Sequence, residues 1–151
     1  MIVEIPSLVL RVHPGYGKAL RVQRPIPNGS VVLSLESDVT RMSTPTATSI
    51  QVGIDEHIDG QPTLYLNHSC EPNVFVDAGT VTVVAIRDIQ PGEDIQFFYP
   101  ANEWNMSVPF ECTCGTTSCL GLISGAREMD HEVLSQYRLN DHIKLLRGYI
   151  N

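Results

Sequence analysis

The sequence predicts a mostly β fold with a short helical tail, and three observations support that prediction. Seven short stretches are rich in valine and isoleucine, and glycine, proline, asparagine or aspartate separates them, as is typical of strands joined by turns. Apolar residues recur at helical spacing only beyond Gly125. The 151 residues suffice for one domain with a sizeable core.

The predicted strands follow one another with short connections. In chain order they are residues 8–12, 19–22, 31–35, 49–54, 74–76, 81–86 and 95–99. Residues 38–47 are polar and contain Pro45, so they are predicted to form a loop. In the tail, Met129, Val133 and Tyr137 share one face of a predicted helix. The apolar face continues further, so the tail forms one helix or two and covers either the core or a homodimer seam.

One turn design occurs twice in the sequence. Residues 24–32 and 87–95 share the pattern R-x-I-x-x-G-x-x-[V/I], in which Gly29 and Gly92 follow a short loop and lead into a strand. No other segment repeats, so a solenoid is excluded.

The acidic composition limits the classes of partner. The net charge is −7, whereas binding nucleic acid through its phosphates needs a basic surface. An acidic surface suits a cationic partner better. The apolar N-terminal run contains Glu4, is soon followed by Pro6 and has no basic segment, so it resembles a strand more than a signal peptide. We expect neither nucleic acid nor membrane as a partner, and a cytoplasmic or nuclear location.

Four cysteines form the most specific chemical pattern. Cys112, Cys114 and Cys119 have the spacing C-x-C-x4-C, and Cys70 lies about forty residues upstream. Four thiolates match the tetrahedral preference of a structural zinc ion. Two disulfides, or four unrelated thiols, are the alternatives. Both are less favoured, because an intracellular chain keeps thiols reduced and the three later cysteines are tightly clustered.

Three motifs occur together in one order: LYLNHSCEPNV, AIRDIQPGEDIQFFYP and ECTCGTTSC, with GYG upstream. In this combination the chain resembles the SET-domain methyltransferases with a post-SET zinc loop, over roughly residues 8–123. The stretch YPANEWNMSVPF resembles a compact, SET-only subgroup. The resemblance implies a SET-type β-clip fold of small curved sheets with a pseudoknot, followed by the zinc loop and a C-terminal helix. It divides the chain into a SET domain (1–108), a post-SET zinc loop (109–123) and a helical tail (124–151).

The resemblance also implies S-adenosyl-L-methionine as methyl donor and a lysine amine as acceptor. Carried over by position, the donor site comprises Gly15, Tyr16, Gly17, Asn67, His68, Tyr99, Trp104 and Leu120. Tyr99 would sit beside the transferring methyl group, and Phe97 would set how many methyl groups are added. The zinc ligands would be the four cysteines.

The aromatic run suits this chemistry, because methyl transfer needs a neutral amine and an apolar channel disfavours the ammonium form. Phe97 and Tyr99 share one face of a strand and Phe98 the other. Three alternatives stay open at this point. In the first, Phe97 and Tyr99 serve only as core residues. In the second, His68 is structural and meets the donor only through its backbone. In the third, Glu103 either recognises a cationic substrate or belongs to the solvated surface.

Three functions remain for comparison. The first is methylation of lysine in a basic protein or peptide. The second is methylation of a small amine, favoured because the segment between Ser37 and Thr63, which must build one wall of the peptide groove, is short. The third is a catalytically inactive binding module, against which the intact motif residues argue.

Overall fold

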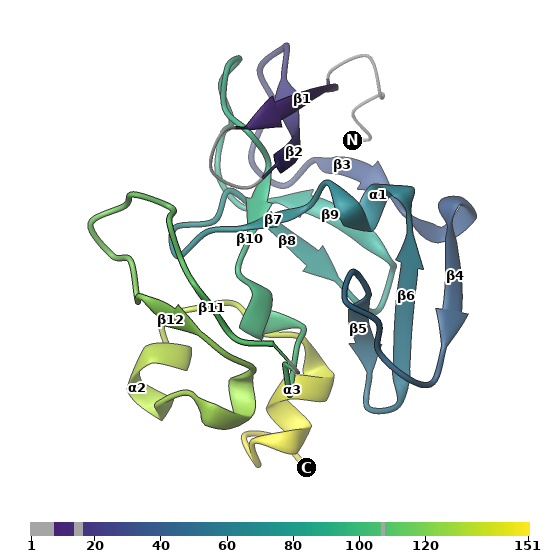
Figure 1. The fold of residues 1–151 in the computed structure, drawn as a ribbon, viewed down its shortest axis with the longest axis vertical. Coiled ribbons are helices and arrows are strands. Elements are labelled where there is room, and N and C mark those ends of the chain that lie inside the picture. Colours follow the sequence, from purple (N-terminus) through teal and green to yellow (C-terminus); the bar gives the residue numbers. More distant parts are fainter. Residues whose placement is uncertain (1–7, 14–16, 107) are drawn as a thin grey trace.

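The computed structural model describes residues 8–13, 17–106 and 108–151. Within these ranges the protein is mostly β, with short helices between small sheets (Figure 1). The strands are β1 (Leu8–His13), β2 (Gly17–Val22), β3 (Val31–Ser34), β4 (Val39–Met42), β5 (Ile50–Gly53), β6 (Glu56–Gly60), β7 (Asn67–His68), β8 (Val74–Asp77), β9 (Thr82–Ala85), β10 (Gln96–Phe97), β11 (Phe110–Glu111) and β12 (Leu122–Ile123). The helices are η2 (Glu36–Asp38), α1 (Gln61–Leu64), η3 (Tyr99–Ala101), η4 (Ala126–Glu128), α2 (His131–Leu134) and α3 (Asp141–Leu146).

Two three-stranded antiparallel sheets form the centre of the molecule, with strand orders β3-β9-β8 and β4-β6-β5. The antiparallel hairpin β1-β2 lies at the top of Figure 1, and the hairpin β11-β12 lies at its left. The strands β7 and β10 form a parallel pair, in which Phe97 lies opposite His68. This pairing brings the NHSC segment beside the aromatic run, although about thirty residues separate them in the chain.

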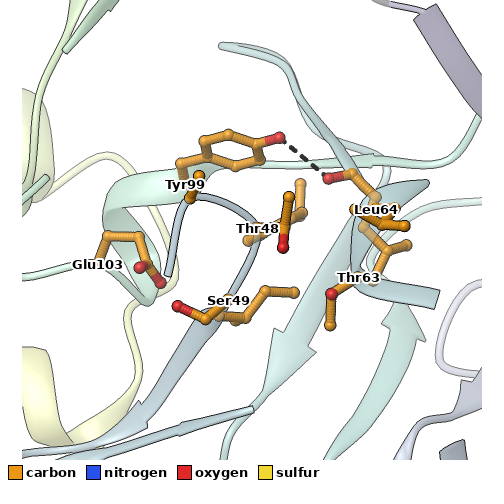
Figure 2. A pocket seen from close by; sticks show the side chains of 10 residues that line it. Thr48, Ser49, Thr63, Leu64, Tyr99 and Glu103 are labelled. Atoms are coloured by element: carbon orange, nitrogen blue, oxygen red, sulfur yellow. Dashed lines mark hydrogen bonds between the residues drawn. The ribbon is translucent and has the colours of Figure 1, made fainter. Parts of the chain in front are cut away.

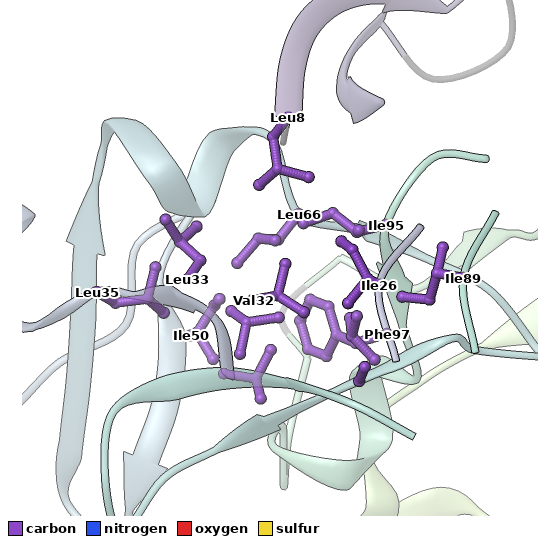
Figure 3. Close-up of a cluster of buried hydrophobic side chains, with 14 of the residues drawn as sticks. Leu8, Ile26, Val32, Leu33, Leu35, Ile50, Leu66, Ile89, Ile95 and Phe97 are labelled. Carbon is purple, nitrogen blue, oxygen red and sulfur yellow. The ribbon is translucent and has the colours of Figure 1, made fainter. Parts of the chain in front are cut away.

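The main core fills the space between the central sheets (Figure 3). It consists of aliphatic side chains with one aromatic ring, that of Phe97, and each member is nearly excluded from solvent. Their burial is the dominant favourable contribution to folding, at roughly 25 cal/mol per Å² of apolar surface. The buried ring of Phe97 therefore anchors the end of β10 in the core.

The two copies of the repeated turn design lie against each other. Ile26 and Ile89 form an antiparallel bridge, in which each backbone amide donates to the carbonyl of the other at 2.8–2.9 Å. Both isoleucines are buried in the main core. The sequence repeat thus reflects a paired structural unit, which holds the loop before β10 in place.

A second apolar cluster joins the tail to the SET-like part. Phe75 and Phe98 pack there with Leu134, Leu139 and Ile143, all buried. Gly125 permits this packing, because a β-carbon at that position would lie 2.3 Å from the carbonyl oxygen of Trp104. Part of the apolar surface of the tail is therefore covered by the same chain, whereas Leu145 and Ile150 are exposed. A homodimer through the tail stays a prediction.

The mostly β prediction is confirmed, and each of the seven predicted stretches contains a strand. Two local predictions were wrong. Residues 39–42 form β4, paired with β6, rather than a loop, because an exposed edge strand needs few apolar residues. The last predicted strand ends at Phe97, since Tyr99 already begins η3. Among the described residues, no helix has the length and apolar character to cross a membrane.

Candidate functional site

Tyr99 is held at both ends by the segment around β7. Its backbone amide donates to Nδ1 of His68 at 3.1 Å, and its hydroxyl donates to the carbonyl oxygen of Leu66 at 3.0 Å. Pro100 follows and occupies the first turn of η3, where the missing amide proton costs nothing. The ring is thereby fixed in one orientation before any ligand arrives.

Two of the cavities that Tyr99 lines define the candidate site. The first, of about 180 Å³, is lined by Asn67, His68, Tyr99 and residues 110–114. The second, of about 110 Å³, includes Tyr99, Thr63, Leu64, Phe97 and Glu103 in its wall (Figure 2). We call them the hairpin-side cavity and the core-side cavity. Among the described residues, Tyr99 is the one that lines both of these cavities.

His68 connects Tyr99 to the cysteines. Its ring is buried, and the loss of solvation lowers its pKa to about 4, so the ring is neutral at physiological pH. Because Nδ1 accepts a hydrogen bond from Tyr99, the ring proton resides on Nε2, which lies 3.4 Å from Sγ of Cys70. The ring of His68 is thus occupied by contacts within the protein.

Asn67 connects the same cavity to the first hairpin. Its side-chain amide donates to the carbonyl oxygen of Lys18 at 2.7 Å, which places Gly17 beside the NHSC segment. Gly17 has φ +81°, a conformation that other residues rarely adopt. Gly15 and Tyr16, also predicted to bind the donor, lie outside the described residues.

The four cysteines converge, as the motif predicted. Their Sγ atoms all lie within 4.8 Å of one another, and all four are free thiols. The Cys70 and Cys112 sulfurs are 3.8 Å apart, close to the separation of about 3.8 Å that tetrahedral zinc with Zn–S bonds of about 2.3 Å requires. The donor set therefore fits a structural zinc ion.

Backbone amides support the cluster from outside. The amides of Cys114 and Leu120 each lie 3.3 Å from a cysteine sulfur, Cys112 and Cys70 respectively. Such amides stabilise thiolates, in the way that outer contacts orient the ligands of metal sites. The hairpin β11-β12 carries the three later cysteines, and the hydroxyl of Tyr137 donates to the Cys70 carbonyl at 2.6 Å. The cluster thus connects the NHSC segment, the hairpin and the tail.

The comparison with family models is consistent with this geometry. Residues 17–100, more than half of the chain, match the model "SET domain". The chain belongs to the SET-domain family. The matched range contains the NHSC segment, β7, β10 and Tyr99, but ends before the later cysteines.

Curated relatives of this SET domain include methyltransferases of fungi. Methyltransferase flvH of Aspergillus flavus is 46% identical over 107 residues, which cover 68% of this chain and 60% of that protein. A histone-lysine N-methyltransferase, H3 lysine-36 specific, of Aspergillus oryzae is 36% identical over 72 residues, or 44% of this chain and 7% of the relative. The chain thus spans less than two thirds of the relatives it matches.

Solved structures share the SET fold at low identity. The crystal structure of KRYPTONITE in complex with mCHG DNA and SAH has a TM-score of 0.63 at 24% identity, covering 76% of this chain and 28% of that one. The methyltransferase domain of human histone-lysine N-methyltransferase SETMAR has a TM-score of 0.59 at 19% identity, covering 78% and 58%. These likenesses confirm the predicted SET fold.

Two predicted donor-binding residues do not line the hairpin-side cavity as described. Trp104 and Leu120 pack instead against the second apolar cluster. Within that cluster Phe98 stacks face to face on Tyr137, with ring centroids 3.6 Å apart. Leu120 still lies at the cysteine cluster through its backbone amide. Phe97 and Tyr99 share a face, as predicted, with ring centroids 4.8 Å apart. A role for Trp104 in stacking on adenine stays a prediction.

Glu103 points into the core-side cavity of the SET domain, opposite Thr63 and Leu64 (Figure 2). Burial raises the pKa of this carboxyl group to about 7. Burial, with a smaller effect of Glu103, also raises the pKa of Tyr99, so the phenol keeps its proton at neutral pH. The side chain is half-buried and bonded to the Gln51 amide, so it is not a freely solvated surface group.

Sequence reasoning missed the residues that hold Glu103 and η3. The backbone amide of Gln51 donates to Glu103 Oε2 at 2.7 Å. The side-chain oxygen of Gln51 accepts a hydrogen bond from the backbone amide of Trp104 at 2.9 Å. The buried amides of Asn102 and Asn140 donate to backbone carbonyls of β8 and neighbouring segments. No motif or periodicity marks these residues, although polar side chains in apolar surroundings are the general signal.

Proposed function

We propose that this SET-domain protein transfers a methyl group from S-adenosyl-L-methionine to a lysine side chain of a basic protein or peptide. The observation that carries the proposal is Tyr99, which borders both cavities and is fixed by hydrogen bonds at its amide and its hydroxyl. A methyl transfer needs two reactants that meet in line at one point, and holding them there is the main contribution of the protein.

The hairpin-side cavity suits the donor. Asn67 supplies a side-chain oxygen next to the positive-φ Gly17, and residues 110–114 close the opposite wall. The donor supplies a methyl group on a positively charged sulfur. The two KRYPTONITE structures contain SAH, the product that remains after such a transfer, which supports this choice of donor.

Zinc is proposed on the four thiolates. Cys70, Cys112, Cys114 and Cys119 would hold one ion, which would keep the β11-β12 hairpin against the NHSC segment. The role is structural, since four protein ligands leave no open position for a substrate.

The core-side cavity suits an amine. Phe97 and Leu66 provide apolar walls, Glu103 provides negative charge, and the net charge of the chain favours a cationic partner. Relatives named for histone lysine support a lysine acceptor, and one KRYPTONITE structure contains a histone H3 peptide.

A small amine is the second candidate acceptor. The specific observation is the size of the core-side cavity, about 110 Å³. A cavity of this size can hold an amine with a few carbon atoms, and such a ligand needs no peptide groove.

Calorimetry and labelling test these proposals together. The protein is first titrated with S-adenosyl-L-methionine, and binding is expected. It is then incubated with methyl-labelled donor and cell lysate. Label in protein supports the lysine acceptor, whereas label only in small molecules supports the second candidate. Absence of donor binding by the zinc-loaded protein would refute the methyltransferase proposal and favour a binding module.

A further inference from the structure

Glu103 lies one helical turn beyond Tyr99. Its backbone amide donates to the Tyr99 carbonyl at 2.9 Å, so both side chains leave the same side of the turn. Both line the core-side cavity (Figure 2). Both also line a neighbouring cavity of about 130 Å³ that includes Val108, whose side chain is exposed. A path therefore leads from the surface past Glu103 to Tyr99.

The carboxylate has only one partner among the described residues. Oε2 accepts the hydrogen bond from Gln51, and within the described ranges no other donor reaches Oε1 and no basic side chain pairs with the group. One oxygen is thus available to a ligand. Partly buried carboxylates that lack a cation are costly, which makes a cationic ligand the natural partner.

The other residues that line the core-side cavity and its neighbour offer no competing proton acceptor. They carry hydroxyls, amide groups and apolar side chains, and Tyr99 is the only other titratable group lining them as described. Asp59 lies behind one wall, where it accepts from the hydroxyls of Thr46 and Thr48. Hydrogen bonding lowers the pKa of Asp59, so it stays ionised and fixed to that wall.

We propose that Glu103 binds the acceptor amine as its ammonium form and takes the proton that the amine must lose before methyl transfer. The inference rests on the proposed methyltransferase function and adds a named proton acceptor to it. It also narrows the acceptor to an amine whose ammonium form carries a removable proton, which includes primary, secondary and tertiary amines and excludes quaternary ones.

The chemistry requires such a group. A lysine amine has a pKa of about 10.4, so it arrives protonated and without a free electron pair. Efficient proton acceptors have pKa values near the operating pH, and the pKa of Glu103, at about 7, meets that condition. Tyr99 does not, because its raised pKa keeps it protonated. In an apolar cavity, a neutral acid with a neutral amine is favoured over the charged pair.

The step balances without a further reagent. One ammonium proton moves to a carboxylate oxygen of Glu103, and its N–H bonding pair stays on nitrogen. That pair then forms the bond to the methyl carbon, while the carbon–sulfur pair leaves on sulfur. The methylated product carries the positive charge, and Glu103 returns its proton to solvent.

Binding of n-butylamine, which mimics the end of a lysine side chain, tests the cation site without turnover. At pH 8 we expect saturable binding to the wild type and at least tenfold weaker binding to Glu103→Gln, which keeps an oxygen for the Gln51 amide. Affinity for the wild type should fall between pH 7.5 and pH 5.5 as the carboxylate is protonated. Glu132→Gln, at an exposed position on α2, removes the same charge and should bind like the wild type. Equal affinity of wild type and Glu103→Gln, or no binding to either, would overturn the site.

The pH dependence of methyl transfer to poly-L-lysine and n-butylamine tests proton acceptance. Glu103→Gln should transfer methyl groups on the order of a hundredfold more slowly than the wild type at pH 7. The deficit should shrink toward pH 10, where a growing share of the ammonium loses its proton to solvent without help from Glu103. A deficit that is constant across pH would mean a structural role and would overturn proton acceptance. If the wild type transfers no methyl group, the proposed function fails, and butylamine binding still decides whether Glu103 is an amine site.

Discussion

The two sides of Tyr99 are stabilised in different ways. On the core side, Phe97, Leu66 and Ile50 belong both to the cavity wall and to the main apolar core. On the hairpin side, one wall comes from β11 and the start of the loop that follows it. The strand β11 has only two residues and pairs with the equally short β12. A two-stranded hairpin is at best marginally stable alone. We expect a zinc ion on the four cysteine sulfurs to stabilise the hairpin side, as apolar packing stabilises the core side.

This difference indicates that the two halves of the site can be perturbed separately. Metal loss should open the hairpin side and spare the core side. Substitutions within the core-side cavity should change chemistry and selectivity while the cysteine loop stays intact. The predictions below run from the largest expected effect to the smallest.

Removal of the metal is expected to have the largest effect. Binding free energy at a structural zinc site is largely folding free energy, about 10–16 kcal/mol in zinc-finger peptides. Chelation or Cys119→Ser should therefore increase hydrogen exchange in residues 109–121 and weaken S-adenosyl-L-methionine binding, while n-butylamine binding is retained.

Ser118→Ala is the matched control, because it changes the neighbouring position and leaves all four thiols. Elemental analysis should find one zinc ion per chain in the wild type. A metal-free protein with its thiols paired as disulfides would contradict the assignment of the four cysteines.

Tyr99→Phe should lower the rate of methyl transfer about a hundredfold, since the hydroxyl fixes the ring and a misplacement of about 1 Å costs that much. Loss of the hydrogen bond to Leu66 should reduce the free energy of unfolding by only about 1–2 kcal/mol. Melting temperature, donor affinity and turnover are measured for the variant. Tyr65→Phe, which removes an exposed hydroxyl bonded to Gln61, is the control. Turnover near the wild-type rate would show that Tyr99 is only structural.

Phe97 is expected to set the number of methyl groups. Its ring lines the core-side cavity and has no hydroxyl to hold a water there, so a methylated amine can turn and react again. The wild type should give di- or trimethylated product, and Phe97→Tyr should shift the product toward monomethyl. Mass spectrometry of methylated poly-L-lysine measures this. A wild type that yields monomethyl product alone would contradict the role.

The smallest effect concerns stability and pH. The pKa of Glu103 is raised by burial from 4.5 to about 7, so the unfolded chain loses this proton at lower pH than the folded chain does. The free energy of unfolding therefore falls as pH rises from about 4.5 to about 7, and the cost is fully present above pH 7. With allowance for partial exposure, we expect about 1–2 kcal/mol.

Glu103→Gln should thus melt at higher temperature than the wild type at pH 8 and at the same temperature at pH 4.5. Calorimetric melting in both buffers, with zinc at equal concentration, measures the difference. A stability gain that does not depend on pH would mean that packing, and not the buried charge, is responsible.

Much of the site could be predicted from local sequence. The alternation of Phe97, Phe98 and Tyr99 follows from strand geometry and survives although the strand ends early, since the rings still point to opposite clusters. The C-x-C-x4-C spacing together with Cys70 predicted that four thiols converge, because four thiolates match the tetrahedral coordination of one zinc ion. Valine-rich stretches between turn residues predicted the strands for the same local reason.

Only the tertiary structure could decide the rest. Glu103 became a candidate proton acceptor because β5 places the Gln51 amide against it, across 52 positions of sequence. Strand β4 exists because β6 is there to pair with it, although its own residues are polar. The tail packs against Phe98 and Phe75, which lie far from it in the sequence. These features depend on contacts between distant segments, and the free energy of such contacts leaves no periodic signal in either segment alone. Composition, motif spacing and strand alternation therefore determined the fold class and the chemical groups, while folding decided which side of Tyr99 each group occupies.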